Sequence, residues 1–345
     1  MSRVGFIGLG NMGGPMALNV AKAGHTMVVT DIRREAAKPH LDQGAQWADS
    51  PKALAQASEI VFTSLPGPRE VESVALGPGG ILEGAARGAV YVDLSTSSAT
   101  LIRRIHYIYA ERGVDVLDAP VSGGVPGARS GKLAVLVGGD DALYWRIKPV
   151  LDAIGDKVMR VGEIGCGTIA KLVHNMVSAC ARMAIAEGMT LGVKAGVKPE
   201  ALLDALQRSS FGQGRVLKEM IPNTVFPGNF DTVNFALELL RKDVGLATEL
   251  GREYHVPMMI AALAEQQLEE GLRRGWGHRD SNSLFLLQEG APASSSEQGK
   301  DDRSAGLRQE IGNGDLSGGG GERPRAVTGT QHLDAAVVPA VGRRR

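Results

Sequence analysis

The sequence lacks the features that mark several specialised classes of protein. It has only two cysteines, Cys166 and Cys180, which are too few for a disulfide framework and lack the spacing of a metal site. This low cysteine content fits a reducing compartment. There is also no excess of either charge, because 38 basic and 38 acidic residues balance. The composition therefore favours neither nucleic acid nor anionic lipid as a partner, and we expect a small-molecule partner.

Long apolar runs are missing as well. The N-terminal stretch begins with an arginine followed by apolar residues, as a signal peptide would, but glycines, Asn11 and Pro15 interrupt it. The longest later apolar stretch, residues 169–193, carries charged residues and a histidine and is too polar for a lone membrane span. We therefore expect a soluble, cytoplasmic protein that does not bind a membrane.

The sequence does contain a regular alternation of strand-like and helix-like segments over its first 162 residues. Helical stretches at 11–23, 98–111 and 140–153 separate short runs rich in aliphatic and β-branched residues. These runs are RVGFIG, TMVVTD, EIVFTSLP, AVYVDLS, VDVLDAP, LAVLVGG and KVMRVG. The alternation predicts an α/β domain with a mostly parallel, doubly wound sheet covered on both faces.

The rest of the chain has a different pattern. Residues 163–289 are helical in periodicity, which predicts a C-terminal all-α domain built on a long helix. The helical stretches lie near 167–195, 199–208, 232–251 and 257–273. Residues 290–345 contain no aromatic residue and a run of four glycines, which predicts a disordered, low-complexity tail. The expected organisation is thus 1–162, 163–289 and 290–345.

The glycine-rich turn after the first strand-like run has the spacing of a dinucleotide-binding loop. It joins a strand to a helix, which is the context that gives this pattern meaning. Gly8 permits the tight turn, Gly10 lets the backbone approach a pyrophosphate, and Gly13 lets the helix pack closely on the strand. We place Gly8, Gly10, Asn11, Met12 and Gly13 at a cofactor site. A glycine-rich turn without a ligand would share the pattern.

Asp31 strengthens this interpretation. It ends the second strand-like run about 20 residues after the glycines, where an acid can bind the adenosine ribose hydroxyls. An acid would repel a 2′-phosphate, so NAD is favoured. Arg33 and Arg34 keep NADP as an alternative, since either could bind that phosphate. We assign at least one of these arginines to a solvated helix start.

Two further segments carry polar residues that could meet a substrate. Ser122 precedes Gly123 and Gly124, which have no side chain to cover their backbone N–H groups, so the segment can wrap around a carboxylate. An ordinary glycine-rich loop without a ligand would have the same sequence pattern. In the helix that follows Gly165, Lys171 and Asn175 are neighbours one turn apart. A solvated helix face would look the same.

That helix also has an apolar face and a second candidate acid/base. The apolar positions, which we expect to pack against the protein, are Ile169, Leu172, Val173, Met176, Val177, Cys180, Met183 and Ala184. Lys171 lies on the opposite face. His174 lies at the edge of the polar stripe and is a rival to Lys171, although a lone helical histidine is usually structural.

Five motifs, in this order and spacing, resemble the β-hydroxyacid dehydrogenase family of 3-hydroxyisobutyrate and tartronate semialdehyde dehydrogenases, which is related to 6-phosphogluconate dehydrogenase. They are GFIGLGNMGGPMA, DLST, DAPVSGGVPGARSGKLAVLVGG, GCGTIAKLVHNMV and LLRKDVGLATELG. The resemblance covers residues 3 to about 289, and the tail has no counterpart in it. It implies a Rossmann-type N-terminal domain and a homodimer or homotetramer built through the helical domain.

The resemblance implies a role for each matching residue. Lys171 matches the catalytic lysine and Asn175 the asparagine that holds the substrate, while Ser122, Gly123 and Gly124 match the loop that takes the substrate carboxylate. The remaining matches are Leu65, Pro66 and Thr96 along the nicotinamide half of the cofactor, and Lys242 and Asp243 as a pair that closes on the site.

These residues suit hydride transfer between NAD, or alternatively NADP, and a small 3-hydroxy acid or its semialdehyde. A lysine can act as base and acid if burial lowers its pKa, and no metal is expected.

Three alternatives stay open. A decarboxylating relative that acts on a sugar-acid phosphate would have a larger helical domain, and an imine-reducing relative usually has an acid or tyrosine in place of Lys171. A non-catalytic scaffold would have lost Lys171 or Asn175.

Overall fold

The computed structural model describes residues 1–288, so the predicted tail at 290–345 lies outside the described residues. The chain divides into one compact unit, Met1–Ile185, and a second that begins at Ala186. This division falls inside the long helix α9 (Cys166–Lys194). The boundary expected between residues 162 and 163 therefore stays a prediction.

The first unit is built on a nine-stranded sheet in the order β3-β2-β1-β4-β5-β6-β8-β7, with β9 paired to β8. The strands are β1 (Arg3–Ile7), β2 (Thr26–Thr30), β3 (Gln46–Trp47), β4 (Ile60–Thr63), β5 (Val90–Asp93), β6 (Asp115–Asp118), β7 (Val121–Ser122), β8 (Ala134–Gly138) and β9 (Lys157–Gly162). Pairing is parallel from β3 to β6 and antiparallel where β8 meets β6 and β7. The predicted α/β fold is confirmed, with all seven predicted strands present.

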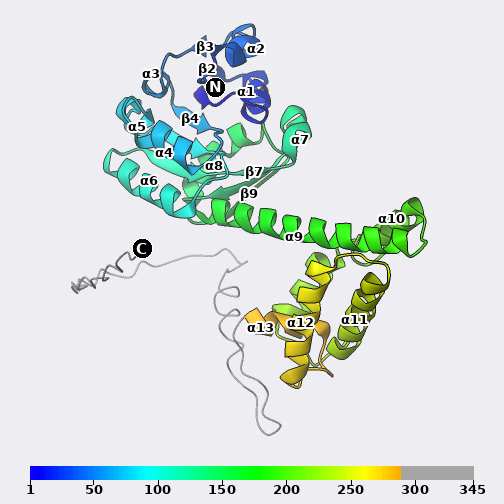
Figure 1. The fold of residues 1–345 in the computed structure, drawn as a ribbon. Coiled ribbons are helices and arrows are strands. Elements are labelled where there is room, and N and C mark those ends of the chain that lie inside the picture. The colour runs from blue at the N-terminus through cyan, green and yellow to red at the C-terminus, as the bar shows by residue number, and fades with distance from the viewer. Residues whose placement is uncertain (289–345) are drawn as a thin grey trace, which may run out of the picture. The chain divides into compact units, whose positions relative to one another are not determined.

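Helices cover both faces of this sheet. They are α1 (Gly13–Lys22), the 3-10 helix Arg34–Ala37, α2 (Lys38–Leu41), α3 (Pro51–Gln56), α4 (Pro68–Leu76), α5 (Ile81–Gly84), α6 (Ala99–Glu111), α7 (Gly124–Ser130) and α8 (Asp141–Leu151). Neighbouring strand residues point to opposite faces, so Phe6 joins the core beneath α1 and α8, whereas Ile7 joins the core beneath α3, α4 and α6. Figure 1 shows α4 to α6 on one side of the sheet and α1 and α7 on the other.

The second unit is helical, as predicted. It contains the end of α9, α10 (Pro199–Arg208), a π-helix (Val216–Val225), α11 (Leu237–Glu253), α12 (Met259–Arg273), a 3-10 helix (Ser281–Leu284) and α13 (Phe285–Gln288). Its core includes Phe230, Leu268 and Trp276. The helix predicted from residue 232 begins later, at Leu237, because the Asp280 carboxylate accepts the preceding N–H groups, those of Asn234 and Phe235.

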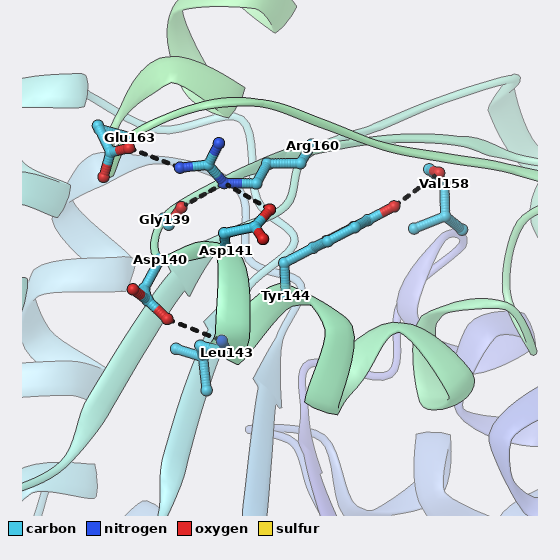
Figure 2. Close-up of polar contacts among 8 residues, drawn as sticks. All are labelled: Gly139, Asp140, Asp141, Leu143, Tyr144, Val158, Arg160 and Glu163. Carbon is cyan, nitrogen blue, oxygen red and sulfur yellow. Dashed lines mark hydrogen bonds and ion pairs between the residues drawn. The ribbon is translucent and has the colours of Figure 1, made fainter. Parts of the chain in front are cut away.

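An arginine braces the segment that leads into α9. The Arg160 guanidinium, at the end of β9, donates to the carbonyl oxygen of Gly139 at 2.8 Å and pairs with the Glu163 carboxylate. It also lies 3.9 Å from a carboxylate oxygen of Asp141 at the start of α8 (Figure 2). One side chain thus ties together the end of β8, the start of α8 and the turn before α9.

The apolar stripe of α9 is not covered in the described residues. Leu172, Met176 and Met183 are 44%, 60% and 52% exposed, whereas Lys171 is only 9% exposed. The prediction that this stripe packs against the protein is therefore wrong for the described residues, and of the two interpretations left open for Lys171 the solvated helix face is the one that the structure excludes. Helical periodicity identifies which residues share a face, but it does not identify which face is covered.

The same helix meets a simple test for a membrane span. Among the described residues, α9 alone is long and apolar enough to cross a membrane by length and composition, which differs from our expectation that it is too polar. A single helix of this kind is weak evidence, because core helices of soluble proteins pass the same test.

Candidate active site

The loop between β1 and α1 requires glycine at specific positions. Gly8 has a φ of +91°, in the left-handed region that favours glycine. A Cβ at Gly13 would overlap the carbonyl oxygen of Gly8, so the close approach of α1 to β1 requires glycine there too. A Cβ at Gly10 would meet no atom within 4 Å, which leaves open space over the first turn of α1. The free N–H groups at this end of the helix can bind a phosphate.

Asp31 is fixed at the edge of this loop. Its largely buried carboxylate accepts the backbone N–H of Leu9 at 2.7 Å and that of Arg33 at 2.8 Å. The Arg33 guanidinium lies 3.9 Å from the same carboxylate, and the Arg34 guanidinium lies over the Trp47 ring, 5.4 Å from its centroid. Arg34 thus has an aromatic partner of its own, whereas Arg33 lies beside Asp31 and lines the same cavity.

One cavity of about 1090 Å³ lies at the carboxyl ends of β1, β2, β4 and β5 and extends to α9. The order of the strands reverses between β1 and β4, where open α/β sheets bind their ligands. The predicted residues that line this cavity are Gly8, Gly10, Asn11, Met12, Gly13, Asp31, Leu65, Pro66, Thr96, Ser122, Gly124, Lys171 and Asn175.

The other predicted residues lie elsewhere. Gly123 joins two lining residues with a φ of +134° but does not line the cavity itself. Lys242 and Asp243 lie on α11 in the second unit, where the Lys242 ammonium is 3.1 Å from the Asp243 carboxylate. The roles of all these residues stay predictions.

Several lining residues were not assigned to the site from the sequence. They include Ile32, Ser64, Arg69, Glu70, Ser73 and Ser95. Most of them lie just after a strand or in the first turn of the helix that follows it. In a parallel sheet the loops after the strands all lie at the carboxyl edge, and this rule could have identified these residues. Three of the unassigned lining residues are charged, namely Asp49 and, at the start of α4, Arg69 and Glu70.

Lys171 has the environment that a proton-transferring lysine needs. It lies in the second turn of α9, lines the cavity, and is buried. Burial lowers the pKa of its ammonium, because the charged form loses hydration. Among residues 1–288 its ammonium has no hydrogen bond or ion pair that would offset this effect. The neutral amine is therefore accessible at a lower pH than for an ordinary lysine.

The direction of α9 is set by the end of β6. The buried Asp118 carboxylate accepts the backbone N–H of Gly165 at 2.7 Å and that of Thr168 at 2.6 Å. These groups belong to the turn before α9 and to its first turn, where the helix itself supplies no acceptor. A Cβ at Gly167 would overlap the carbonyl oxygen of Leu136, so the helix start also lies tightly against β8. Lys171 follows one turn later.

A contact joins this helix to the loop predicted to bind a carboxylate. The Oγ of Ser122, at the end of β7, lies 3.1 Å from Nε2 of His174. Ser122 lines the cavity, whereas His174 is exposed and does not line it. This placement favours Lys171 over His174 as the group that meets the reacting atoms.

Beneath the cavity, β5 ends in a buried carboxyl group. The Thr63 hydroxyl donates to Asp93 at 2.8 Å, and the backbone N–H of Ser95 donates to the same oxygen at 3.0 Å. The Ser95 hydroxyl in turn accepts the N–H of Leu65, which lines the cavity. Burial raises the pKa of Asp93 to about 6. The second carboxyl oxygen of Asp93 has no hydrogen-bond partner among the described residues.

We expect Asp93→Asn to remove a pH dependence of folding stability. Asp93 in the folded protein keeps its proton over a range in which the unfolded chain has lost it, so the free energy of unfolding falls as pH rises from about 4 to about 6. A difference of about two pKa units corresponds to about 3 kcal/mol. Relative to the parent, Asp93→Asn should therefore gain about that amount between pH 4 and pH 7, measured by urea unfolding.

Asp152→Asn is the matched control, because that carboxylate is exposed and pairs with Lys148 on the surface. The difference in free energy of unfolding between Asp152→Asn and the parent should stay nearly constant with pH. Parent and Asp93→Asn curves that stay parallel from pH 4 to pH 7 would contradict the burial argument.

Comparison with known proteins gives matches along most of the chain. Residues 3–162 match the family described as the NAD binding domain of 6-phosphogluconate dehydrogenase, and residues 165–287 match the NAD-binding of NADP-dependent 3-hydroxyisobutyrate dehydrogenase. A 2-(hydroxymethyl)glutarate dehydrogenase from Eubacterium barkeri is 39% identical over 287 residues, which cover 83% of this chain and 95% of the relative. A 3-hydroxyisobutyrate dehydrogenase from Pseudomonas aeruginosa is 38% identical over 269 residues, which cover 76% of this chain and 90% of the relative.

A solved structure shows the same fold at lower identity. An imine reductase from Myxococcus stipitatus, in complex with NAD⁺, aligns with a TM-score of 0.74 and 20% identity, over 84% of this chain and 99% of that one. At this identity the likeness concerns the fold alone. It carries no information on which chemistry the cavity supports.

Proposed function

Because the chain belongs to the β-hydroxyacid dehydrogenase family, we propose that it interconverts a small 3-hydroxy acid and the corresponding semialdehyde or 3-oxo acid. Membership makes the chain an NAD(P)-dependent hydroxyacid oxidoreductase. The observation that carries the finer proposal is the buried Lys171, which shares one cavity with the glycine loop and with Ser122.

The cofactor site fits a dinucleotide, because the space over Gly10 is open and a large cavity extends from Asp31 toward α9. When bound, the nicotinamide ring accepts or supplies the hydride. The glycine loop holds the phosphates, and Leu65, Pro66 and Thr96 line the far half of the cavity.

Each substrate group has a residue of this chain assigned to it. Lys171 takes the hydroxyl proton during oxidation and returns it during reduction, as a lysine with a lowered pKa can do. Asn175, one turn along α9, holds the substrate hydroxyl in place, and the loop from Ser122 to Gly124 takes the carboxylate. The family resemblance assigns a site-closing role to Lys242 and Asp243, which lie on α11.

The test is a panel of 3-hydroxy acids and their semialdehydes, assayed separately with NAD and NADP by nicotinamide absorbance. We expect turnover on at least one short 3-hydroxy acid. If no member is turned over, a parallel panel of cyclic imines separates an imine reductase from a non-catalytic, cofactor-binding scaffold. Turnover on imines alone would replace the present proposal.

Asp31 should set a preference for NAD over NADP. A 2′-phosphate would lie against its carboxylate, and two like charges in contact disfavour binding. We expect kcat/KM to be higher with NAD, and Asp31→Asn to lower the NAD to NADP ratio about tenfold, which corresponds to about 1.4 kcal/mol. Arg34→Gln is the control and should leave the ratio nearly unchanged, since Arg34 lies over Trp47. A parent enzyme that prefers NADP would contradict the assignment.

We also propose a cytoplasmic homodimer or homotetramer whose partner molecules are small carboxylates rather than nucleic acid or membrane. The balanced charge and the two free cysteines support this setting. The exposed apolar stripe on α9, which includes Leu172, Met176 and Met183, supports association, because contiguous exposed apolar surface marks interfaces. Molar mass from light scattering tests the assembly.

A further inference from the structure

A second cavity lies along one side of α1, outside the site described above. It has a volume of about 490 Å³, and its walls come from α1, from the 3-10 helix Arg34–Ala37 with α2, and from α7. We call it the α1 groove. On α1 it is lined by Pro15, Leu18 and Lys22, which share one helix face. Lys171 does not line it, so the proposed hydride transfer leaves this cavity without a role.

The α1 groove is positively charged. Lys22, Arg33 and Arg129 line it, and none of the lining residues that the structure describes is acidic. Lys22 and Arg129 are exposed and form no hydrogen bond or ion pair within residues 1–288. Arg33 lies 3.9 Å from the Asp31 carboxylate, which belongs to the cofactor cavity. Cations gathered in a hollow without a counter-charge concentrate the field there and attract anions.

A buried histidine gives a second, independent indication of a ligand. His40 lines the groove and is 5% exposed, and its Nε2 lies 3.0 Å from the carbonyl oxygen of Gly14. A carbonyl oxygen can only accept, so Nε2 carries the hydrogen. Nδ1 of the same ring has no hydrogen-bond partner in the described part of the chain. Because buried polar atoms are nearly always paired, this nitrogen indicates a bound group that supplies the missing partner.

The walls of the groove are held by contacts that need no ligand. The Asn19 amide nitrogen, on α1, donates to the carbonyl oxygen of Ala128 on α7 at 2.8 Å, which fixes α7 beside α1. The contact of His40 with Gly14 fixes α2 against the same helix. The backbone is therefore already arranged for binding, and a ligand loses little affinity to ordering it.

We propose that the α1 groove is a second anion site, which binds a small molecule that carries a diphosphate or a longer chain of phosphates. Lysine and arginine are the side chains that bind phosphate oxygens. Lys22 is the last residue of α1, about 14 Å of helix rise beyond Gly13, whereas Arg33 lies beside the glycine loop. A chain of phosphates presents negative oxygens along this length, and a single phosphate does not.

The groove also adjoins the cofactor cavity. Gly10, Asn11 and Arg33 line both. An anion in the groove therefore lies near the cofactor phosphates at the glycine loop, and like charges repel. We expect an occupied groove to weaken NADH binding about fivefold, and bound NADH to weaken the anion by the same factor. The site is thus inhibitory.

Calorimetric titration of the full-length, NADH-saturated enzyme with inorganic pyrophosphate tests the site, because NADH already fills the cofactor cavity. We expect one pyrophosphate per chain, with a Kd that Lys22→Gln and Arg129→Gln each raise about 3- to 10-fold. Neither residue lines the cofactor cavity, so the Kd for NADH alone should match that of the parent. Lys38→Gln removes a charge from α2 outside the groove and should change the pyrophosphate Kd less than about twofold.

The concentration dependence separates the groove from competition for the cofactor cavity. Pyrophosphate in the groove should raise the Kd for NADH to a plateau, whereas pyrophosphate in the cofactor cavity would raise it without limit. Orthophosphate should bind more weakly than pyrophosphate. The proposal is overturned by a NADH complex that binds no pyrophosphate, by a rise without a plateau, by equal effects of Lys38→Gln and Arg129→Gln, or by equally tight orthophosphate. None of these measurements needs turnover, so their outcome is independent of the proposed dehydrogenase substrate.

Discussion

Replacing Lys171 with alanine is expected to lower kcat by about two to four orders of magnitude, the usual worth of a positioned acid or base. The melting temperature and the Kd for NAD should change little, because the ammonium has no hydrogen bond or ion pair among the described residues that its loss would break. Steady-state kinetics on a substrate found in the panel, together with NADH fluorescence titration, measure both quantities.

The pH dependence gives a second reading of the same residue. Oxidation needs the neutral amine, and burial lowers the pKa of Lys171, so turnover in that direction should rise with pH below the ordinary lysine range. The Lys171→Ala variant should lose this rising limb. Lys157→Ala is the control, since that lysine is on the surface at the start of β9. Near-parental turnover in Lys171→Ala would remove the residue from the chemistry.

Asp118→Ala is expected to destabilise the protein by about 4 kcal/mol. Its removal leaves the N–H groups of Gly165 and Thr168 buried without an acceptor, at roughly 1 to 3 kcal/mol each, and creates a small cavity. Turnover should fall as well, because the first turn of α9 sets the position of Lys171. Asp118→Asn keeps one acceptor oxygen and should cost less. Urea unfolding and kcat measured on the same preparations test both effects.

Asp115, at the other end of β6, provides the control for this experiment. It is exposed and pairs with Arg146 at 3.4 Å, so Asp115→Ala should change the free energy of unfolding by no more than about 0.5 kcal/mol. An Asp118→Ala protein as stable as this control would show that water or a backbone shift satisfies the two N–H groups.

The sequence predicts best the features that rest on local rules. The central parallel strands, such as β4 and β5, have both faces buried, so each appears as a short, continuous apolar run. The roles of Gly8 and Gly13 could be predicted because each depends on the backbone conformation of the same short loop. By contrast, β3 and β7 have two residues each, too few for any periodicity to be visible.

The features that depend on distant contacts could not be predicted. Ser122 meets His174 only because β7 pairs antiparallel with β8, where Ser122 lies opposite Ala134, and no local pattern encodes that pairing. The burial of Lys171 likewise depends on how Asp118 directs the start of α9. Whether the polar face of that helix is solvated or covers a cavity is a tertiary property.

The spacing of the parallel strands also fixes a distance along the cavity. Asp31 follows β2 and Asp118 ends β6, and the strands between them are β1, β4 and β5. Neighbouring strands lie about 4.8 Å apart, so these four steps span about 19 Å, whatever the loops contain. Cofactor choice at Asp31 and the start of α9, which Asp118 holds, are therefore separated by a fixed length of framework. Substitutions at Asp31 should therefore leave the position of Asp118 unchanged.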